Sequence, residues 1–291
     1  TIPGRGSRFF AVIFMGLRAL TKAPFDNQKE DIGMKVRLGL VLVTAALLSG
    51  TGCAAPGAGG GPAVGPSGTT LPGGQVLPPG TAPRDNSHTR SADLYLTQAQ
   101  STTDEAEAHA RYQDALQAAQ DGITAEPQNA KSYFQAAQAL IGVGDFATAA
   151  TMFDQAEEIY PRYILETEAW RERGWVTAYN AAIEPMNAGD LEGAAELFKQ
   201  ATALFDGRPE ALLQVGSISS QLDRPDDAID AFTQAIEILE ATEEVQMADT
   251  ASAPIWEQHY GIATTGLGQV LTYAERYEEA ADLYTELLGA A

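Results

Sequence analysis

Few residues in this sequence have the chemistry of a nucleophile, a general base or a metal ligand. Among its 291 residues are one cysteine, Cys53, and three histidines, His88, His109 and His259. A single cysteine cannot form an intramolecular disulfide or a cysteine zinc site, and the histidines lack the spacing of a metal or triad motif. No nucleophile elbow or phosphate-binding loop is present either. The sequence therefore predicts a protein that is not an enzyme and that uses no cofactor and no metal.

Carboxylates are abundant, and many of them stand in adjacent pairs. None of the pairs has the alternating oxygen ligands and the central glycine of a calcium loop. We interpret them as solvated helix faces, and Pro225 with the two acids after it as a helix start, because proline suits the first turn and acids suit the positive end of the helix dipole. The pairs are Asp104-Glu105, Glu157-Glu158, Asp226-Asp227, Glu243-Glu244 and Glu278-Glu279.

The chain carries 18 Lys and Arg against 39 Asp and Glu, a formal net charge of −21. This charge is uneven along the sequence. Residues 1–52 contain seven basic and three acidic residues, which leaves 11 basic and 36 acidic residues in 53–291. Because phosphate binding needs a basic surface, this balance excludes nucleic acid as a partner.

The first 52 residues have the pattern of an export signal. From Met34, two basic residues precede an apolar run over residues 38–48, and small residues follow up to Cys53. Eleven apolar residues are too few for a helix across a bilayer about 30 Å thick, which takes roughly 20. A cleaved signal peptide over residues 34–52 fits this pattern. Residues 1–33 show no sustained periodicity, and we interpret them as an upstream extension or as the open start of a fragment.

The end of this segment resembles the bacterial lipoprotein signal, in which a lipobox precedes a cysteine that is acylated before cleavage. Thr51 and Gly52 suit the last two lipobox positions, while Gly50 stands where the family prefers Leu. The resemblance implies lipidation of Cys53 and attachment to the membrane by a lipid anchor only. Since Ala54 rather than Asp follows the cysteine, it implies the periplasmic face of the outer membrane. The alternative is an ordinary signal peptide with a chance cysteine.

A stretch dominated by Gly, Pro and Ala follows the cysteine. No side chain in residues 54–83 is charged, and the first charged residue after them is Arg84. A stretch of this composition cannot bury enough side-chain surface to offset the entropy lost when it becomes ordered. We expect residues 53–91 to be a disordered tether, with an average reach of about 30 Å for some 30 residues. The folded domain is predicted over residues 92–291.

An internal repeat organises that domain. Each copy has an alanine, an aromatic or small residue four positions later, and another small or apolar residue three positions after that. This spacing keeps the three residues on one helical face, where small side chains allow close approach of a neighbouring helix. First members are separated by 34, 45, 34 and 52 residues, and the excesses of 11 and 18 over 34 are close to three and five helical turns. The copies are Ala115/Ala119/Gly122, Ala149/Phe153/Ala156, Ala194/Phe198/Ala201, Ala228/Phe232/Ala235 and Ala280/Tyr284/Leu287.

A period of 34 residues resembles the tetratricopeptide repeat. Gly144-Asp145 is predicted to separate helix A from helix B, Pro161 to end helix B, and Pro254 to lie in the first turn of an early final helix A. The resemblance implies an all-α solenoid of helical hairpins, with repeats over about 96–129, 130–163, 175–208, 209–242 and 261–291. It is carried in 130–163 by Tyr133, Ala136, Ala137, Leu140, Gly144, Asp145, Phe146, Ala149, Phe153, Ala156 and Pro161.

In tetratricopeptide proteins helix A lines a concave groove that binds a partner segment, and this chain matches the groove positions with a mixture of apolar and amide side chains. The resemblance implies a groove for an apolar or helical segment. The alternative is that these residues merely pack between repeats. They are Phe134, Gln138, Tyr179, Ile183, Met186, Leu213, Ser217, Thr265, Gln269 and Tyr273.

Together these features predict an envelope-anchored scaffold or assembly factor that binds another envelope protein or peptide. An accessory or truncated non-catalytic part of a cell-wall enzyme system is the alternative, and sequence beyond Ala291 would separate the two. A small-ligand binder is a third possibility, but an open solenoid seldom provides the closed pocket that it needs.

Overall fold

The computed structural model describes residues 76–249 and 251–290. The predicted upstream extension, signal peptide, Cys53 and most of the tether lie outside these residues. The part described consists of α-helices joined by short loops and one 3₁₀ turn at Pro161–Tyr163. The helices are α2 (Ser87–Ser101), α3 (Glu105–Ala125), α4 (Ala130–Val143), α5 (Phe146–Ile159), α6 (Ile164–Ala188), α7 (Leu191–Leu204), α8 (Glu210–Gln221), α9 (Pro225–Ala248), α10 (Ala253–Tyr273) and α11 (Tyr277–Ala290).

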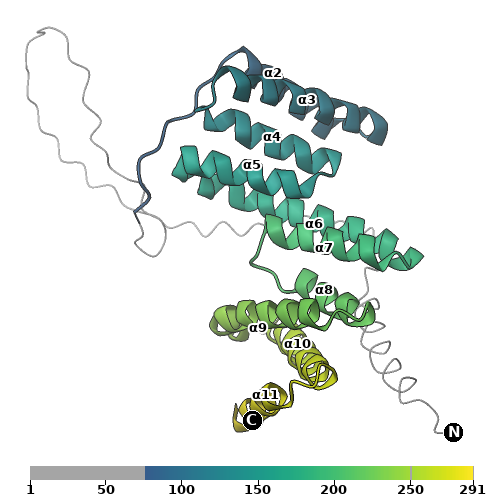
Figure 1. The fold of residues 1–291 in the computed structure, drawn as a ribbon. Helices are drawn as coiled ribbons and strands as arrows, with labels where there is room; N and C mark the ends of the chain where they lie inside the picture. The colour runs from purple at the N-terminus through teal and green to yellow at the C-terminus, as the bar shows by residue number, and fades with distance from the viewer. Residues whose placement is uncertain (1–75, 250, 291) are drawn as a thin grey trace, which may run out of the picture. The chain divides into compact units, whose positions relative to one another are not determined.

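Consecutive helices pair as hairpins, and each hairpin packs on the next along the described stack (Figure 1). The even-numbered helices α2 to α10 are the first members of the hairpins and the odd-numbered helices α3 to α11 are the second. The predicted all-α solenoid of tetratricopeptide-type hairpins is confirmed. Pairing is required because each helix is amphipathic and can bury its apolar stripe only against neighbours.

Glycine and aspartate form the turns inside two of the hairpins. Gly144 and Gly189 have positive φ angles of 86° and 84°, which glycine adopts without strain at a helix C-terminus. The following Asp145 and Asp190 accept hydrogen bonds from the backbone of the next helix and cap it. The predicted break at Gly144-Asp145 is therefore confirmed, as is the end of α5 just before Pro161.

The small and aromatic residues of the repeated triplets form much of the hydrophobic core. Phe153 and Phe198 are fully buried, and each lies between two alanines of its own helix that are also fully buried. The same triplet in α9, with Phe232 at its centre, is buried as well. Tyr284 of α11 is more exposed than its counterparts, and no described helix packs beyond α11.

The extra residues between copies of the repeat lengthen helices, as their number of whole turns predicts. Helix α6 begins at Ile164, eleven residues before the predicted start of its repeat at position 175. Helix α9 continues to Ala248, and α10 begins at Ala253 with Pro254 in its first turn. The extension of α6 matters for the surface, because it projects an additional helical segment beside α5 and α7.

The start of the folded domain was predicted too late. Helix α2 begins at Ser87, although the tether was expected through residue 91 and the first repeat from residue 96. Asn86 caps α2 by accepting a hydrogen bond from the Thr89 backbone, and the Thr89 hydroxyl accepts one from the Asn86 backbone in return. This capping box fixes the first turn. Helix α2 lacks the repeated triplet, so the period did not reveal it.

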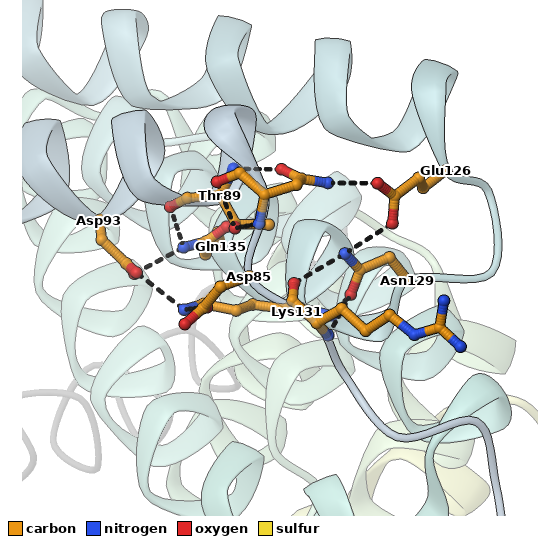
Figure 2. Close-up of polar contacts among 9 residues, drawn as sticks. Asp85, Thr89, Asp93, Glu126, Asn129, Lys131 and Gln135 are labelled. Carbon is orange, nitrogen blue, oxygen red and sulfur yellow. Dashed lines mark hydrogen bonds and ion pairs between the residues drawn. The ribbon is translucent and has the colours of Figure 1, made fainter.

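Residues 76–86, here called the N-terminal strap, are held against the second hairpin, so the predicted disorder does not extend over this part of the tether. The Thr81 amide donates to the Ile159 carbonyl (2.9 Å). Arg84 and Asn129 exchange two hydrogen bonds, one from the Arg84 amide (3.1 Å) and one to its carbonyl (2.9 Å). Figure 2 shows the hydrogen bonds of Asn129 at the start of α4.

Lys131 completes this polar cluster. Its ammonium group lies 2.6 Å from an Asp85 oxygen and 2.8 Å from an Asp93 oxygen (Figure 2). Burial opposes the charge of Lys131, but the hydrogen bonds to the two carboxylates outweigh that effect and raise its pKa. Gln135 donates to the Thr89 carbonyl (2.8 Å) and to Asp93. The strap, α2 and α4 are thus joined by charged and amide groups as well as by alanine packing.

Candidate partner-binding surfaces

The ten residues predicted to line the groove come from α4, α6, α8 and α10, the first helices of four hairpins. The structure buries most of their surface between helices. Leu213 is fully buried and Gln138 is buried as well, so neither can line a groove that is open to a partner. Their assignment to the groove was wrong, because close packing of α8 and α4 with their neighbours covers those positions.

Aromatic stacking accounts for two further groove residues. The Phe134 ring stacks on Tyr163, with 5.0 Å between ring centroids. Tyr179 stacks on Trp175 at 4.9 Å and meets Phe198 edge to face at 5.0 Å. These contacts make Phe134 and Tyr179 part of the packing between helices, which is the alternative that the sequence left open.

The hydroxyl of Tyr179 is also engaged. It accepts a hydrogen bond from the Gln214 amide at 3.4 Å, and burial raises its pKa. Ile183 and Met186 are half-buried and pack against the same apolar core. The part of α6 that was predicted to face a partner is therefore largely occupied by α7 and α8.

The last four of the ten predicted groove residues lie on α8 and α10. Ser217 and Gln269 are half-buried, and the Ser217 hydroxyl donates to the Leu213 carbonyl at 2.8 Å. Of the ten, only Thr265 and Tyr273 are well exposed. The Tyr273 hydroxyl donates to Asp223 at 2.8 Å. Few of the predicted groove residues are therefore accessible to a partner.

A cleft of about 1140 Å³ is lined by none of the ten predicted groove residues, and we call it the α6 cleft. One wall is the eleven-residue extension of α6, and the others come from α5, α7, α8 and α9. Helix α5 packs against α7, but in the described part α9 has no comparable backbone contact with α7 (Figure 1). The cleft opens between α7 and α9. Its lining residues are Asp154, Glu157, Ile164, Leu165, Thr167, Glu168, Arg171, Lys199, Thr202, Ala203, Leu204, Phe205, Asp206, Leu212, Val215, Asp227, Asp230, Ala231 and Gln234.

Arg171 holds one end of the cleft in place. Its guanidinium donates to Asp154 at 2.6 Å and to Glu157 at 3.1 Å, and a third nitrogen lies 3.4 Å from the Leu204 carbonyl at the end of α7. The Thr167 hydroxyl also donates to Glu157. Because Arg171 is only 14 % exposed and bonds to α5 and α7 from α6, it fixes the α6 extension against both helices.

Apolar and acidic side chains share the mouth of the cleft. Ile164 is 40 % exposed and Leu165 is 46 % exposed, and both stand in the first turn of α6. The lining includes six carboxylates but two cations, Arg171 and Lys199. Lys199 of α7 lies 3.8 Å from Asp227 of α9, so an ion pair crosses the mouth between these helices. The surface of the cleft thus combines two exposed apolar side chains with surrounding negative charge.

Sequence reasoning did not find this cleft. The excess of eleven residues before the third repeat signalled a longer helix, but the family pattern assigns partner binding to the first helices of the hairpins. The signal that was available is the pair Ile164 and Leu165, two large apolar residues outside the repeated triplets. Their exposure depends on how α6 extends past α5, and the sequence period does not report that.

The described residues include few groups with metal-binding or catalytic chemistry. Across 76–249 and 251–290, no group of three or more His, Cys, Asp or Glu could hold a metal ion. His259 is partly buried beside Arg208 and Glu210; burial lowers its pKa, Glu210 opposes that shift and Arg208 adds to it. Within the same residues, the helices do not combine the length and apolar character of a membrane span.

Comparison with protein families identifies two stretches of the chain. Residues 130–163 and residues 179–242 each match a family described as tetratricopeptide repeat. The first stretch coincides with α4 and α5 and the second with most of α6 through most of α9. No curated protein sequence matches the chain.

Several solved structures are similar to this chain. MamA from Desulfovibrio magneticus RS-1 is 15% identical, with 68% of this chain and 94% of that chain covered and a TM-score of 0.29. TTC0263, a thermophilic tetratricopeptide protein of Thermus thermophilus, is 20% identical over 69% and 91%, with a TM-score of 0.26. A chain of the APC/C hetero-tetramer Cut9-Hcn1 is 16% identical over 68% and 33%, with a TM-score of 0.30.

Proposed function

We propose that this protein is a scaffold that holds a segment of another protein at the bacterial cell envelope. Tetratricopeptide repeats are a non-catalytic module for protein interaction, and this chain contains them at residues 130–163 and 179–242. The observation that carries the proposal is the continuous stack of hairpins, with exposed apolar surface at Ile164 and Leu165. A rigid stack presents such surface without the cost of ordering a loop.

The proposed location rests on the sequence before the strap. Met34 to Cys53 resembles a lipoprotein signal, and lipidation of Cys53 would anchor the protein at the periplasmic face of the outer membrane. The Gly/Pro/Ala-rich residues from 54 onward would act as the tether between the anchor and the strap. In this proposal the protein works as an assembly factor, and its partner is another envelope protein or peptide.

Photo-crosslinking in cells of the source organism tests the scaffold function. A photoreactive amino acid would be placed at Leu165 in the α6 cleft, at Tyr273 on the predicted groove side, or at Leu94 of α2 as an exposed control. We expect a discrete crosslinked protein from Leu165 or Tyr273 and none from Leu94. The scaffold function is contradicted if neither test position yields a product that the control lacks.

Metabolic labelling tests the anchor independently. Radiolabelled fatty acid should be incorporated into the natural protein and not into Cys53→Ser, because acylation needs the thiol. Membrane fractionation should then show release of the variant from the membrane. Equal labelling of the two proteins would refute the lipid anchor and leave the interaction function to be judged by crosslinking.

A further inference from the structure

We infer that the α6 cleft binds an amphipathic helical segment of a partner protein whose polar face is rich in Lys and Arg. The inference rests on the proposed scaffold function and gives it a binding surface and a partner chemistry. It also assigns partner binding to a different set of residues from the groove predicted by family resemblance.

The size of the cleft fits a polypeptide segment. Its volume of about 1140 Å³ exceeds the roughly 300 to 1,000 Å³ of pockets that take small molecules. A second hollow of about 510 Å³ adjoins it, since Asp230 and Gln234 line both. The second hollow continues between α9, α10 and α11, so the surface extends along the hairpins.

The apolar part of the cleft suits the apolar face of a helix. Ile164 and Leu165 form an exposed ledge, while Leu212, Val215 and Ala231 of α8 and α9 line the cleft but are buried and form its packed base. Helices that bind in grooves insert side chains spaced three and four positions apart into such a surface. Burial of the ledge by a partner would remove apolar area that water now contacts.

The charges select the polar face of the bound helix. The cations in the cleft are already engaged, since Arg171 bonds to Asp154 and Glu157 and Lys199 lies near Asp227. Among the described residues, Glu168 and Asp206 have no ion-pair partner, and both are exposed at the cleft. Uncompensated carboxylates beside an exposed apolar ledge attract Lys and Arg and repel acidic segments.

The same argument disfavours a second copy of the folded domain as the occupant. Residues 53–291 carry 11 basic and 36 acidic residues, so two copies repel one another. Residues 1–52 are basic and contain apolar runs, and the test below therefore includes a chain that lacks them.

Two designed peptides probe the cleft on the full chain and on a chain that lacks residues 1–52. Both have about 18 residues, or five helical turns, with leucines on one face. The opposite face carries lysines in one peptide and glutamates in the other. Binding would be measured by fluorescence anisotropy of the labelled peptides. We expect saturable binding of the lysine peptide and none of the glutamate peptide.

Matched charge reversals locate the binding site. Glu168→Lys with Asp230→Lys places two positive charges at the cleft, while Glu184→Lys with Glu237→Lys changes the net charge equally on the same two helices outside it. All four carboxylates are exposed. At low salt the cleft variant should weaken the lysine peptide by about tenfold or more and the control variant by less than about twofold, and the difference should shrink as salt rises.

A second pair of variants tests the apolar ledge. Ile164→Ser with Leu165→Ser should weaken the lysine peptide by about tenfold at any salt concentration, because contacts of apolar anchors are not screened. Leu94→Ser with Ile255→Ser removes comparable exposed side chains from α2 and α10 and should change affinity by less than about twofold. Circular dichroism of all four variants would verify that they fold.

The results separate this inference from the scaffold function. Equal weakening by cleft and control variants, or equal binding of both peptides, overturns the inference. So does binding only after residues 1–52 are removed, or self-association that the cleft variants abolish, since each gives the cleft another occupant. If crosslinking in cells then captures a partner from Tyr273 alone, the scaffold function stands without this cleft.

Discussion

Arg171 joins three helices through one side chain. It reaches from α6 to Asp154 and Glu157 on α5 and to the Leu204 carbonyl at the end of α7, and its guanidinium lies over the Phe153 ring at 5.2 Å. The geometry suits arginine and not lysine, because several nitrogen donors in one plane meet acceptors from separate elements. Loss of this group would leave Glu157, which is mostly buried, without its cation.

Replacement of Arg171 should therefore destabilise the fold. We expect Arg171→Met to lower the free energy of unfolding by about 2 kcal/mol, since the mostly buried carboxylate of Glu157 loses its charged donors. Urea titration followed by circular dichroism measures the change. Arg173→Met on the same helix removes an exposed arginine that lies over Trp170, and we expect a loss of less than about 1 kcal/mol. Equal losses would contradict the role given to Arg171.

His259 gives the fold a pH dependence of known sign. Burial lowers its pKa below 6.5 in the folded chain, so the unfolded chain binds the proton more readily. Its contribution to stability is present above about pH 6.5 and is lost as the pH falls from there toward the folded pKa. Unfolding free energy between about pH 7.5 and 5.5 should thus fall more steeply for the natural protein than for His259→Gln. Parallel pH profiles would show that His259 is not buried in this way.

At the residue scale, the sequence predicted which residues form the turns, but it did not predict which side chains are exposed. Gly144, Asp145 and Pro161 were assigned correctly because turn chemistry is local. Leu213 and Gln138 were placed in a groove because their family positions face one, but their exposure depends on how far neighbouring helices approach. That distance is a property of several elements together.

The packing of α9 between α8 and α10 depends on two glycines. A methyl group on Gly216 of α8 would lie 2.8 Å from the Phe232 ring, and one on Gly266 of α10 would lie 2.6 Å from it. Phe232 is buried, so its ring has contacts on both sides and cannot move away from one without meeting the other. Absence of a side chain at these positions sets the spacing of the three helices.

Gly266→Ala should lower the free energy of unfolding by about 1 to 2 kcal/mol. Overpacking typically costs about 1 to 3 kcal/mol, and the gain of up to about 1 kcal/mol in helix propensity offsets part of it. Gly261→Ala is the matched control on α10, because nothing lies within 4 Å of its new methyl group. We expect the control to stabilise the protein by up to about 1 kcal/mol. Thermal and urea unfolding would compare the two variants, and stabilisation by both would contradict the packing.

At the element scale, periodicity predicted most of the helices and failed at the first. The hairpins with the alanine and aromatic triplet lie where the sequence places them, and whole-turn insertions correctly implied longer α6 and α10. Helix α2 is held by its cap and by polar contacts to α4, which leave no 34-residue signature. These contacts occur once in the chain, so a search for the 34-residue period could not reveal them.

The α6 cleft lies beside the extended start of α6 and between α7 and α9, which lack a backbone contact comparable to that of α5 with α7. The sequence indicated the longer α6, but only the arrangement of five helices shows that its first turn stands beside a gap between α7 and α9. The ion pair between Lys199 and Asp227 crosses that gap with both side chains about half exposed. Such a pair contributes little stability, so its main effect is on the charge at the mouth.

Removal of Lys199 should strengthen binding of a basic segment. We expect Lys199→Gln to tighten the complex with the lysine peptide by about two- to threefold at low salt, because the mouth becomes more negative. Anisotropy titrations at several salt concentrations measure the effect, which should vanish at high salt. Arg90→Gln on α2 removes the same charge away from the cleft. An equal gain from both variants would attribute the effect to total charge alone.

The strap has a mechanical consequence. A pull on the chain ahead of residue 76 reaches the second hairpin first, through the bond from Thr81 to Ile159 and the paired bonds of Arg84 with Asn129. Helix α2 comes later along the chain and is not the first element to bear the force. Tension in a tether would accordingly be taken up at the start of α4 and the end of α5, and the terminal hairpin of α2 and α3 would not be pulled away from the stack.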